Sequence, residues 1–337
     1  MSENLCHQNC EGCSTNDSSW LNVGYIQFSA TASLKAIPEE GIRALDIVVF
    51  GFADFHTDKI SHFEDIQDII NKEKPGTLNL LSIGGETVAS IPSPMQAVKN
   101  ICSQIEAYNA ELKNGKFSGV DLDIEHGIRK STINLLAEGF KKAGYIVSAA
   151  PQIYTERGDI DVKNPSNLIF TSGGPQNPYG EVIEKGYIDY IFAQTYNTGG
   201  FKVGGYEEHQ LEFFYAVAEA LNNVAVKEGR IHESTKIIIG EPANQGAGGT
   251  FTIFNPSGEE RPPLRPYVHK ALLDKLRKYI DSIKESKKQP GSKFERISGV
   301  MMWSSNNDYM PNAEPWKDYL AIVGGFSKYI FDSDKKD

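Results

Sequence analysis

The chain has 337 residues, of which 40% are hydrophobic and 23% are charged. This composition is ordinary for a globular protein with a sizeable core, and the length fits one α/β barrel or two medium domains. The formal net charge of −10 argues against nucleic acid or an anionic membrane surface as a partner, because both require a basic patch. A neutral polymer or a small molecule is easier to accommodate.

The N-terminal segment is expected to be a flexible tail over residues 1–18. Its cysteines, Cys6, Cys10 and Cys13, have the C-x3-C-x2-C spacing of the iron–sulfur site in radical S-adenosylmethionine enzymes. In those enzymes the motif follows the first strand, whereas here it precedes every strand signal. We therefore favour a tail in which metal binding or disulfide formation would be incidental. Residues 331–337 are expected to form a charged C-terminal tail.

The sequence shows no long apolar run and no basic segment followed by an apolar one at its start. It therefore predicts neither a transmembrane helix nor a secretory signal. The localisation stays open, with the cytoplasm or release by a non-standard route as the expectation.

Short runs rich in Val, Ile, Leu and Phe recur along the chain and alternate with helical patterns. Such runs are typical of parallel strands covered by helices. Eight strands are predicted: Val23–Phe28, Asp46–Gly51, Thr77–Ile83, Gly119–Ile124, Tyr145–Ala149, Ile188–Thr195, Lys236–Ile239 and Ile297–Trp303. The clearest helices are predicted at Met95–Leu112, Lys130–Ala143, Leu211–Glu228 and Tyr267–Glu285.

Eight strand–helix units without a linker predict a closed (β/α)8 TIM barrel in one domain, residues 19–330. Two long connections rich in Gly and Pro follow strands, at Ile153–Lys185 and at Glu241–Pro266. Both lie at the carboxyl ends of strands, where barrel enzymes place their active sites. The residues before the eighth strand are taken up by one loop and one helix, which leaves no room for an inserted domain.

The fourth strand carries the chemistry. Side chains alternate along a strand, so Val120, Leu122 and Ile124 face the helices while Asp121, Asp123 and Glu125 face the barrel interior. Same-face positions are roughly 7 Å apart. Three acids at this spacing cannot all ionise easily, so at least one should keep its proton near neutral pH, as a general acid requires. Glu125 is nearest the open mouth and is the best candidate for that acid.

A metal site at the same place is disfavoured because no set of histidines accompanies the carboxylates. His126 follows Glu125 directly, but alternation places it on the opposite face of the strand. We expect no metal and no cofactor.

Four motifs in order make the sequence resemble glycoside hydrolase family 18, the chitinases and related endo-N-acetylglucosaminidases. Ser82-Ile-Gly-Gly85 is similar to the family's S-x-G-G, and Asp121 to Glu125 matches D-x-D-x-E. Gln194-Thr-Tyr-Asn197 is similar to Q-x-Y-N, and Met301-Met-Trp303 ends where the family places a substrate-platform tryptophan. Together with Ala150-Pro-Gln152, these motifs resemble the plant class III and compact bacterial branches.

The resemblance spans roughly Val23 to Trp316, and the chain departs from it in one place. The fuller family pattern is D-G-x-D-x-D-x-E, and its first position is Ser118 here. This change concerns the fine adjustment of pH dependence more than activity itself. The missing inserted domain implies a member with a shallower and more open cleft.

The resemblance implies retaining hydrolysis assisted by the substrate's own 2-acetamido group. Glu125 would be acid and then base, Asp123 would orient the acetamido group, and Asp121 would share a proton with Asp123. Tyr196 would hydrogen-bond the acetamido oxygen, and Trp303 would form the floor beneath the sugar.

Further residues are candidates for contacting the substrate or for supporting the carboxylates. Gln194 is expected to bond the aspartates or the sugar, and Asn197 to shape the loop or to touch substrate. Gln152 and Tyr154 are candidate sugar contacts at the mouth. In the supporting layer, Ser82 is expected to bond Asp121, while Gly84 and Gly85 provide turn geometry.

The expected function is that of a chitinase acting on chitin or chito-oligosaccharides, as a monomer without nucleic-acid or membrane partners. Two alternatives stay open: an endo-β-N-acetylglucosaminidase acting on N-glycans, which uses the same acetamido chemistry, and a non-catalytic chitin-binding lectin. The presence of Glu125 speaks against the lectin.

Overall fold

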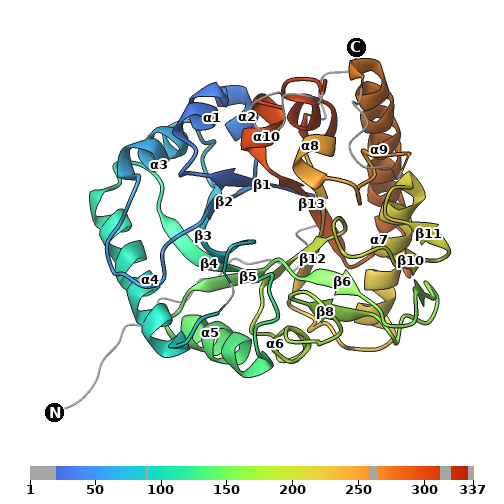
Figure 1. Cartoon of the computed structure of the whole chain (residues 1–337), viewed down its shortest axis with the longest axis horizontal. Coiled ribbons are helices and arrows are strands. Elements are labelled where there is room, and N and C mark those ends of the chain that lie inside the picture. The colour runs from blue at the N-terminus through green and yellow to red at the C-terminus, as the bar shows by residue number, and fades with distance from the viewer. Residues whose placement is uncertain (1–19, 89, 258–264, 312–319, 333–337) are drawn as a thin grey trace.

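A computed structural model describes residues 20–88, 90–257, 265–311 and 320–332. Within these ranges eight parallel strands close into a barrel (Figure 1). Closure is made by β13 pairing with β1, where Leu21 lies opposite Gly299, and by β12 pairing with both β9 and β13. The barrel strands are β1 (Leu21–Gln27), β2 (Ile47–Gly51), β3 (Leu78–Gly84), β4 (Phe117–Asp123), β5 (Ile146–Ala149), β9 (Tyr190–Gln194), β12 (Lys236–Pro242) and β13 (Ile297–Trp303). The predicted (β/α)8 fold is therefore confirmed.

The predicted strand and helix positions agree closely with the structure. All eight strands begin and end within three residues of the predicted limits. The four predicted helices are α4 (Pro94–Glu111), α5 (Lys130–Lys142), α7 (Leu211–Val226) and α9 (Pro266–Lys287). The shorter helices were not predicted: α1 (Thr31–Ala36), α2 (Glu39–Arg43), α3 (Phe63–Ile70), α6 (Gly180–Glu184), α8 (Gln245–Gly248), α10 (Ser305–Tyr309) and the π-helix η1 (Ser327–Phe331). Except for α3, these have fewer residues than two helical turns, too few for a clear period.

Two apolar layers form because side chains alternate along each strand. One set fills the barrel interior and includes Val23, Val49 and Phe192. The opposite set faces the surrounding helices and includes Val120 and Leu122 of β4. The polar side chains of β4, Asp121 and Asp123, therefore lie inside the barrel, as predicted.

The long connection after β5 has more structure than the predicted loop. It contains β6 (Gln152–Tyr154), β7 (Asp159–Ile160), β8 (Ile169–Thr171) and α6, while β10 (Lys202–Val203) and β11 (Tyr206–Glu207) follow β9. β6 pairs with β8 and touches β9, and β7, β10 and β11 form a small second sheet. Strands this short depend on partners distant in sequence, so local pattern cannot reveal them.

The connection between β12 and β13 contains α8 and α9, and its described part contains no strand. This agrees with the expected absence of an inserted domain at this point. Among the described residues no helix combines the length and the apolar character needed to span a membrane. Cys6, Cys10 and Cys13 lie outside the described residues, as do residues 333–337 of the tail predicted at 331–337. Phe331, the first residue of that predicted tail, is buried at the end of η1.

Candidate active site

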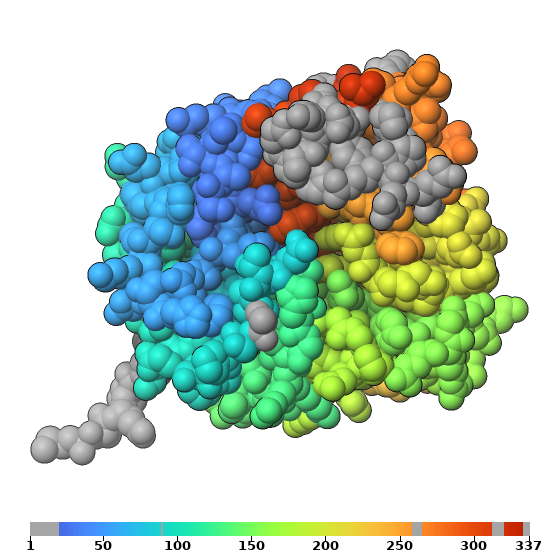
Figure 2. Space-filling view, viewed as in Figure 1, coloured from blue at the N-terminus to red at the C-terminus, as the bar shows by residue number. Residues whose placement is uncertain are grey.

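A cleft of about 650 Å³ opens at the carboxyl end of the barrel strands. In Figure 2 a hollow lies near the middle of the face, bordered by blue, teal and yellow segments, with red atoms of the β13 segment at its base. Its lining combines the predicted site residues with several new ones: Gln27, Phe52, Gly85, Glu86, Thr87, Asp123, Glu125, His126, Gln152, Gln194, Tyr196, Asn197, Ala247, Gly249, Trp303 and Asn307.

Asp121 lies beneath the cleft and is completely buried. Three hydroxyl groups from three strands donate to it: Ser148 to Oδ1 at 2.6 Å, and Ser82 and Tyr25 to Oδ2 at 2.7 and 2.8 Å. Burial raises the pKa of Asp121, and the three donated bonds oppose that rise. A carboxylate that accepts three hydrogen bonds is stabilised as the anion, so Asp121 is the aspartate best suited to stay ionised. The predicted bond from Ser82 is confirmed.

Asp123 lies one step nearer the cleft, and its environment favours the acid form. Burial raises its pKa well above the usual range, and the charges of Glu125 and Asp121 raise it further. A single donated bond opposes them, from Gln194 Nε2 to Asp123 Oδ1 at 2.9 Å. The predicted contact of Gln194 with an aspartate is confirmed. A proton shared between these two neighbouring carboxyl groups would therefore favour Asp123.

Glu125 is partly buried in the cleft wall. Burial raises its pKa to about 7, and the negative charge of Glu86 acts in the same direction, while His126 opposes both. Near neutral pH about half of the Glu125 side chains would carry a proton. This is the condition in which one group can serve first as acid and later as base.

The segment carrying Glu125 is not part of β4, which ends at Asp123. Alternation therefore stops before Glu125, and the prediction that His126 lies on the opposite face is wrong: both side chains line the cleft. The segment is held by Tyr179, whose hydroxyl accepts from Ile124 N–H at 2.9 Å, and by the bond from Gly127 N–H to Ser172 O at 2.8 Å.

Tyr196 and Asn197 enter the cleft from the segment after β9. Tyr196 is 5% exposed, and burial raises its pKa well above the usual range, so its hydroxyl is a neutral donor. Asn197 adopts a left-handed conformation with φ of 54°, and its N–H donates to Phe251 O at 2.9 Å. Asn197 thus shapes the loop and also reaches the cleft.

Trp303 and Phe52 form an aromatic part of the cleft, and the buried Tyr25 packs against Trp303. The Trp303 ring centroid lies 5.4 Å from that of Tyr25 and 5.9 Å from that of Phe52. The ring is only partly buried, which leaves indole surface for a ligand. The peptide bonds Gly51–Phe52 and Trp303–Ser304 are both cis.

Gly84 and Gly85 bring the end of β3 against the catalytic strand. A Cβ on Gly84 would lie 2.0 Å from Asp123 O, and one on Gly85 would lie 2.7 Å from the Phe52 ring. Both have positive φ, 117° and 79°, a region that favours glycine. Gly85 N–H donates to Asp123 O at 2.6 Å. Their expected part in turn geometry has a clear steric basis.

The two candidates after the fifth strand are placed differently. Gln152 lines the cleft. Tyr154 lies two residues further on, outside the cleft lining, and its ring packs edge-on against Phe201 with centroids 6.1 Å apart. A sugar contact stays a prediction for both.

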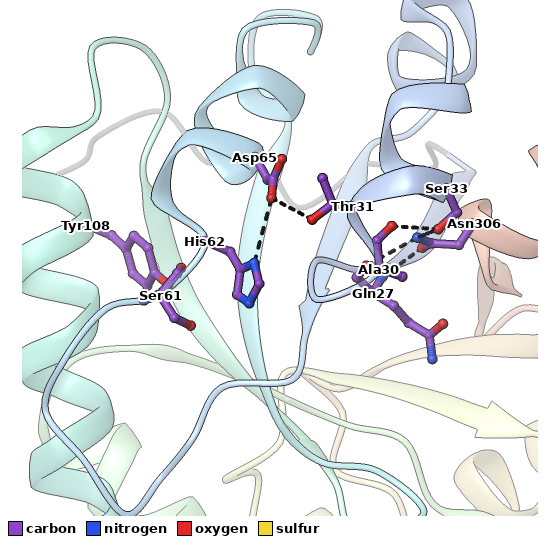
Figure 3. Close-up of polar contacts among 9 residues, drawn as sticks. All are labelled: Gln27, Ala30, Thr31, Ser33, Ser61, His62, Asp65, Tyr108 and Asn306. Carbon is purple, nitrogen blue, oxygen red and sulfur yellow. Dashed lines mark hydrogen bonds and ion pairs between the residues drawn. The ribbon is translucent and has the colours of Figure 1, made fainter.

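Gln27, which the sequence analysis did not single out, is fixed at the end of β1. Asn306 Oδ1 accepts from Gln27 N–H at 2.7 Å, and Asn306 Nδ2 donates to Gln27 O at 3.2 Å and to Ser33 Oγ at 2.7 Å. Figure 3 shows the Gln27 side chain extending away from this contact. Nearby, Thr31 at the start of α1 donates to Asp65 of α3 at 3.1 Å.

Sequence reasoning also missed Tyr25, Ser148, Tyr179 and Glu86. Alternation could have found Tyr25 and Ser148, which face inward on strands predicted correctly. Tyr179 and Glu86 lie after strands and gave no periodic signal. Among the described residues no group of three or more His, Cys, Asp or Glu side chains is arranged to hold a metal ion.

Comparisons with known proteins agree with this geometry. The sequence pattern of the family described as glycosyl hydrolases family 18 matches residues 22–263. Several solved structures have the same fold. A candidate chitinase A from Streptomyces coelicolor aligns with a TM-score of 0.57 at 18% identity, over 93% of this chain and 98% of that one. The active domain 2 of a thermostable chitinase from Pyrococcus furiosus aligns with a TM-score of 0.55 at 13% identity, over 92% of this chain and 93% of that one. A chitinase from Bacteroides thetaiotaomicron aligns with a TM-score of 0.53 at 16% identity, over 94% of this chain and 99% of that one.

A search of curated protein sequences found no match. The structural likenesses, all under 25% identity, show the fold alone. The matching family pattern makes the protein a glycoside hydrolase. The chain belongs to glycosyl hydrolases family 18.

Proposed function

We propose that this glycoside hydrolase is a chitinase that cleaves β-1,4 bonds between N-acetylglucosamine units with the help of the substrate's acetamido group. The observation that carries the proposal is the hydrogen bonding of the row. Three hydroxyls donate to Asp121, whereas one amide donates to Asp123, whose pKa is raised well above the usual range by burial and by the charges of Glu125 and Asp121. We infer that Asp123 keeps the proton it shares with Asp121, and burial raises the pKa of Glu125 to about 7.

This pattern makes Asp123 a poor nucleophile, because a protonated carboxyl group cannot attack the anomeric carbon. The nucleophile then has to come from the substrate, and the carbonyl oxygen of a 2-acetamido group is the nearest one available. A protonated Asp123 can still turn toward the acetamido group and exchange hydrogen bonds with it. The pattern therefore favours sugars that carry an N-acetyl group at the cleaved bond.

In the first step Glu125 gives its proton to the glycosidic oxygen while the acetamido oxygen bonds to the anomeric carbon and the leaving sugar departs. Asp123 orients the acetamido N–H and balances the positive charge of the oxazolinium ion, with Asp121 taking up the shared proton. Tyr196 donates to the acetamido oxygen, and Trp303 supports the sugar ring from below.

In the second step water attacks the anomeric carbon and reopens the oxazolinium ring. Glu125, now ionised, accepts a proton from that water and returns to its starting state. Attack by the acetamido oxygen and then by water inverts the anomeric carbon twice, so the product keeps the β configuration.

Glu125→Gln tests the proposal. Removing the general acid should lower hydrolysis of a chromogenic chito-oligosaccharide by about 10²- to 10⁴-fold without loss of folding. Glu111→Gln, at the exposed end of α4, is the matched control and should behave as the wild type. Unchanged turnover in Glu125→Gln would refute the assignment of the acid.

The choice of substrate needs its own experiment. Wild-type protein incubated with colloidal chitin should release soluble oligosaccharides, whereas a denatured N-glycoprotein incubated in parallel should keep its glycans. The opposite result would identify an endo-β-N-acetylglucosaminidase. Binding of chito-oligosaccharides without any product would identify a lectin.

A further inference from the structure

Glu86 stands beside the catalytic acid, and the proposed mechanism does not use it. In the register of β3 and β4, Gly84 lies opposite Asp123. Both strands end at this pair, and Glu86 and Glu125 each follow two residues later, in the segments that leave the strands side by side. The bond from Gly85 N–H to Asp123 O fixes this approach at 2.6 Å. Both carboxyl groups line the same cleft.

The Glu86 side chain is exposed, and no hydrogen bond or ion pair with another described residue occupies it. It is close enough to Glu125 to be the main charge that raises the pKa of that acid. A carboxylate placed next to another acid, without a cation of its own, is a site where a positively charged ligand group would be stabilised.

The rest of the cleft has the same sign. Among the described residues its lining includes Glu86, Asp123 and Glu125, with His126 as the single basic type and no lysine or arginine. A sugar with a negative substituent would meet only repulsion from these carboxyl groups. A sugar with an ammonium group would find an unpaired partner in Glu86.

The reaction itself decides which sugar can be charged. The sugar that is attacked must carry an N-acetyl group, because that group is the nucleophile, and Asp123, Tyr196 and Trp303 surround it. The leaving sugar has no such requirement. Glu125 would bond the oxygen between the two sugars. Glu86 adjoins Glu125 and is not one of the residues that surround the attacked sugar in the proposed mechanism.

We propose that Glu86 selects a glucosamine unit, with a free ammonium group at C2, on the leaving side of the cleaved bond. This inference rests on the proposed function and names its substrate class more closely: partially N-deacetylated chito-oligosaccharides. The contact is an exposed ion pair, and such pairs favour binding by about twofold to fivefold.

The test uses the intact protein and a partially N-deacetylated chitosan of known composition, with the products sequenced by mass spectrometry. New reducing ends report the sugar that was attacked, and new non-reducing ends report the leaving sugar. In the wild type the reducing ends should all be N-acetylglucosamine. The non-reducing ends should be enriched in glucosamine by about twofold to fivefold over the substrate composition.

Glu86→Gln should remove the enrichment at the non-reducing ends and leave the reducing ends unchanged, and Glu86→Lys should reverse it. Glu111→Gln again serves as the control and should match the wild type. High salt should reduce the enrichment in the wild type, because an exposed charge contact is screened. Glu86→Gln, Glu86→Lys and the wild type at high salt each give a separate readout from folded, active protein, so the result does not depend on one variant.

Two failures can be told apart. If Glu86→Gln gives the same non-reducing ends as the wild type while the reducing ends are still N-acetylglucosamine, the selection by Glu86 is refuted and the proposed chitinase mechanism stands. If glucosamine appears freely at new reducing ends, or if nothing is cleaved, the proposed function fails, and the inference fails with it.

Discussion

Tyr179→Phe tests whether the segment carrying Glu125, the proposed general acid, is held as the structure indicates. Tyr179 is fully buried, just before α6, and its hydroxyl accepts from Ile124 N–H at 2.9 Å. The same hydroxyl lies 3.1 Å from Leu122 O and 3.2 Å from Ile124 O. Phenylalanine keeps the ring but removes the partner of a buried N–H one residue before Glu125.

The cost can be worked out from these contacts. Leu122 O keeps another donor, Ala150 N–H at 3.0 Å, so the main loss is the orphaned Ile124 N–H. A buried donor without a partner costs about 1–3 kcal/mol. For a protein of this size the melting temperature should fall by about 1–4 °C. Because the Glu125 segment loses an anchor, kcat should fall by about tenfold to a hundredfold, as misplaced catalytic groups do.

Thermal unfolding and steady-state hydrolysis of a chromogenic chito-oligosaccharide measure the two effects. Tyr145→Phe is the matched control: Tyr145 is half-buried, and its hydroxyl forms no hydrogen bond with another described residue. A Tyr179→Phe protein with the stability and kcat of the wild type would refute the reasoning. Lower stability with unchanged kcat would show that Tyr179 supports the fold and not the acid.

Two further predictions concern protonation and the loop after β9. In the proposed mechanism Glu125 must be protonated for the first step, and its pKa is raised from 4.5 to about 7. The value of kcat/KM should therefore fall about tenfold per pH unit above about pH 7. A kcat/KM that already falls above about pH 4.5 would contradict the raised pKa. Glu208→Ala should raise KM and lower the melting temperature. The buried Glu208 accepts from Thr198 N–H at 2.8 Å, from the Thr198 hydroxyl and from Gly200 N–H at 3.3 Å, and an orphaned buried donor costs about 1–3 kcal/mol. Isothermal titration with a chito-oligosaccharide and thermal unfolding measure the two effects, and unchanged values in both would show that Glu208 does not brace the segment carrying Tyr196 and Asn197.

The sequence by itself determined the barrel and the composition of its carboxylate row. Strands covered by helices appear as nearly continuous aliphatic runs, so their number and limits can be read directly. Alternation then placed Asp121 and Asp123 inside the barrel, because a strand fixes the direction of every second side chain. The contacts of Gln194 and Ser82 with these aspartates were expected for residues of the motifs that carry the family resemblance.

Only the tertiary structure decided how protons are distributed in that row. The three hydroxyls that donate to Asp121 and oppose the rise of its pKa lie 27, 39 and 96 residues away in the chain, and no local pattern connects them. The end of β4 at Asp123 placed His126 in the cleft, against the prediction from alternation, because the strand's hydrogen bonds stop there. The approach of Glu86 to Glu125 depends on the register of β3 and β4 and on two glycines that let the backbones meet. The kinds of residue at the site follow from the sequence, while their charges follow from neighbours that only folding brings together.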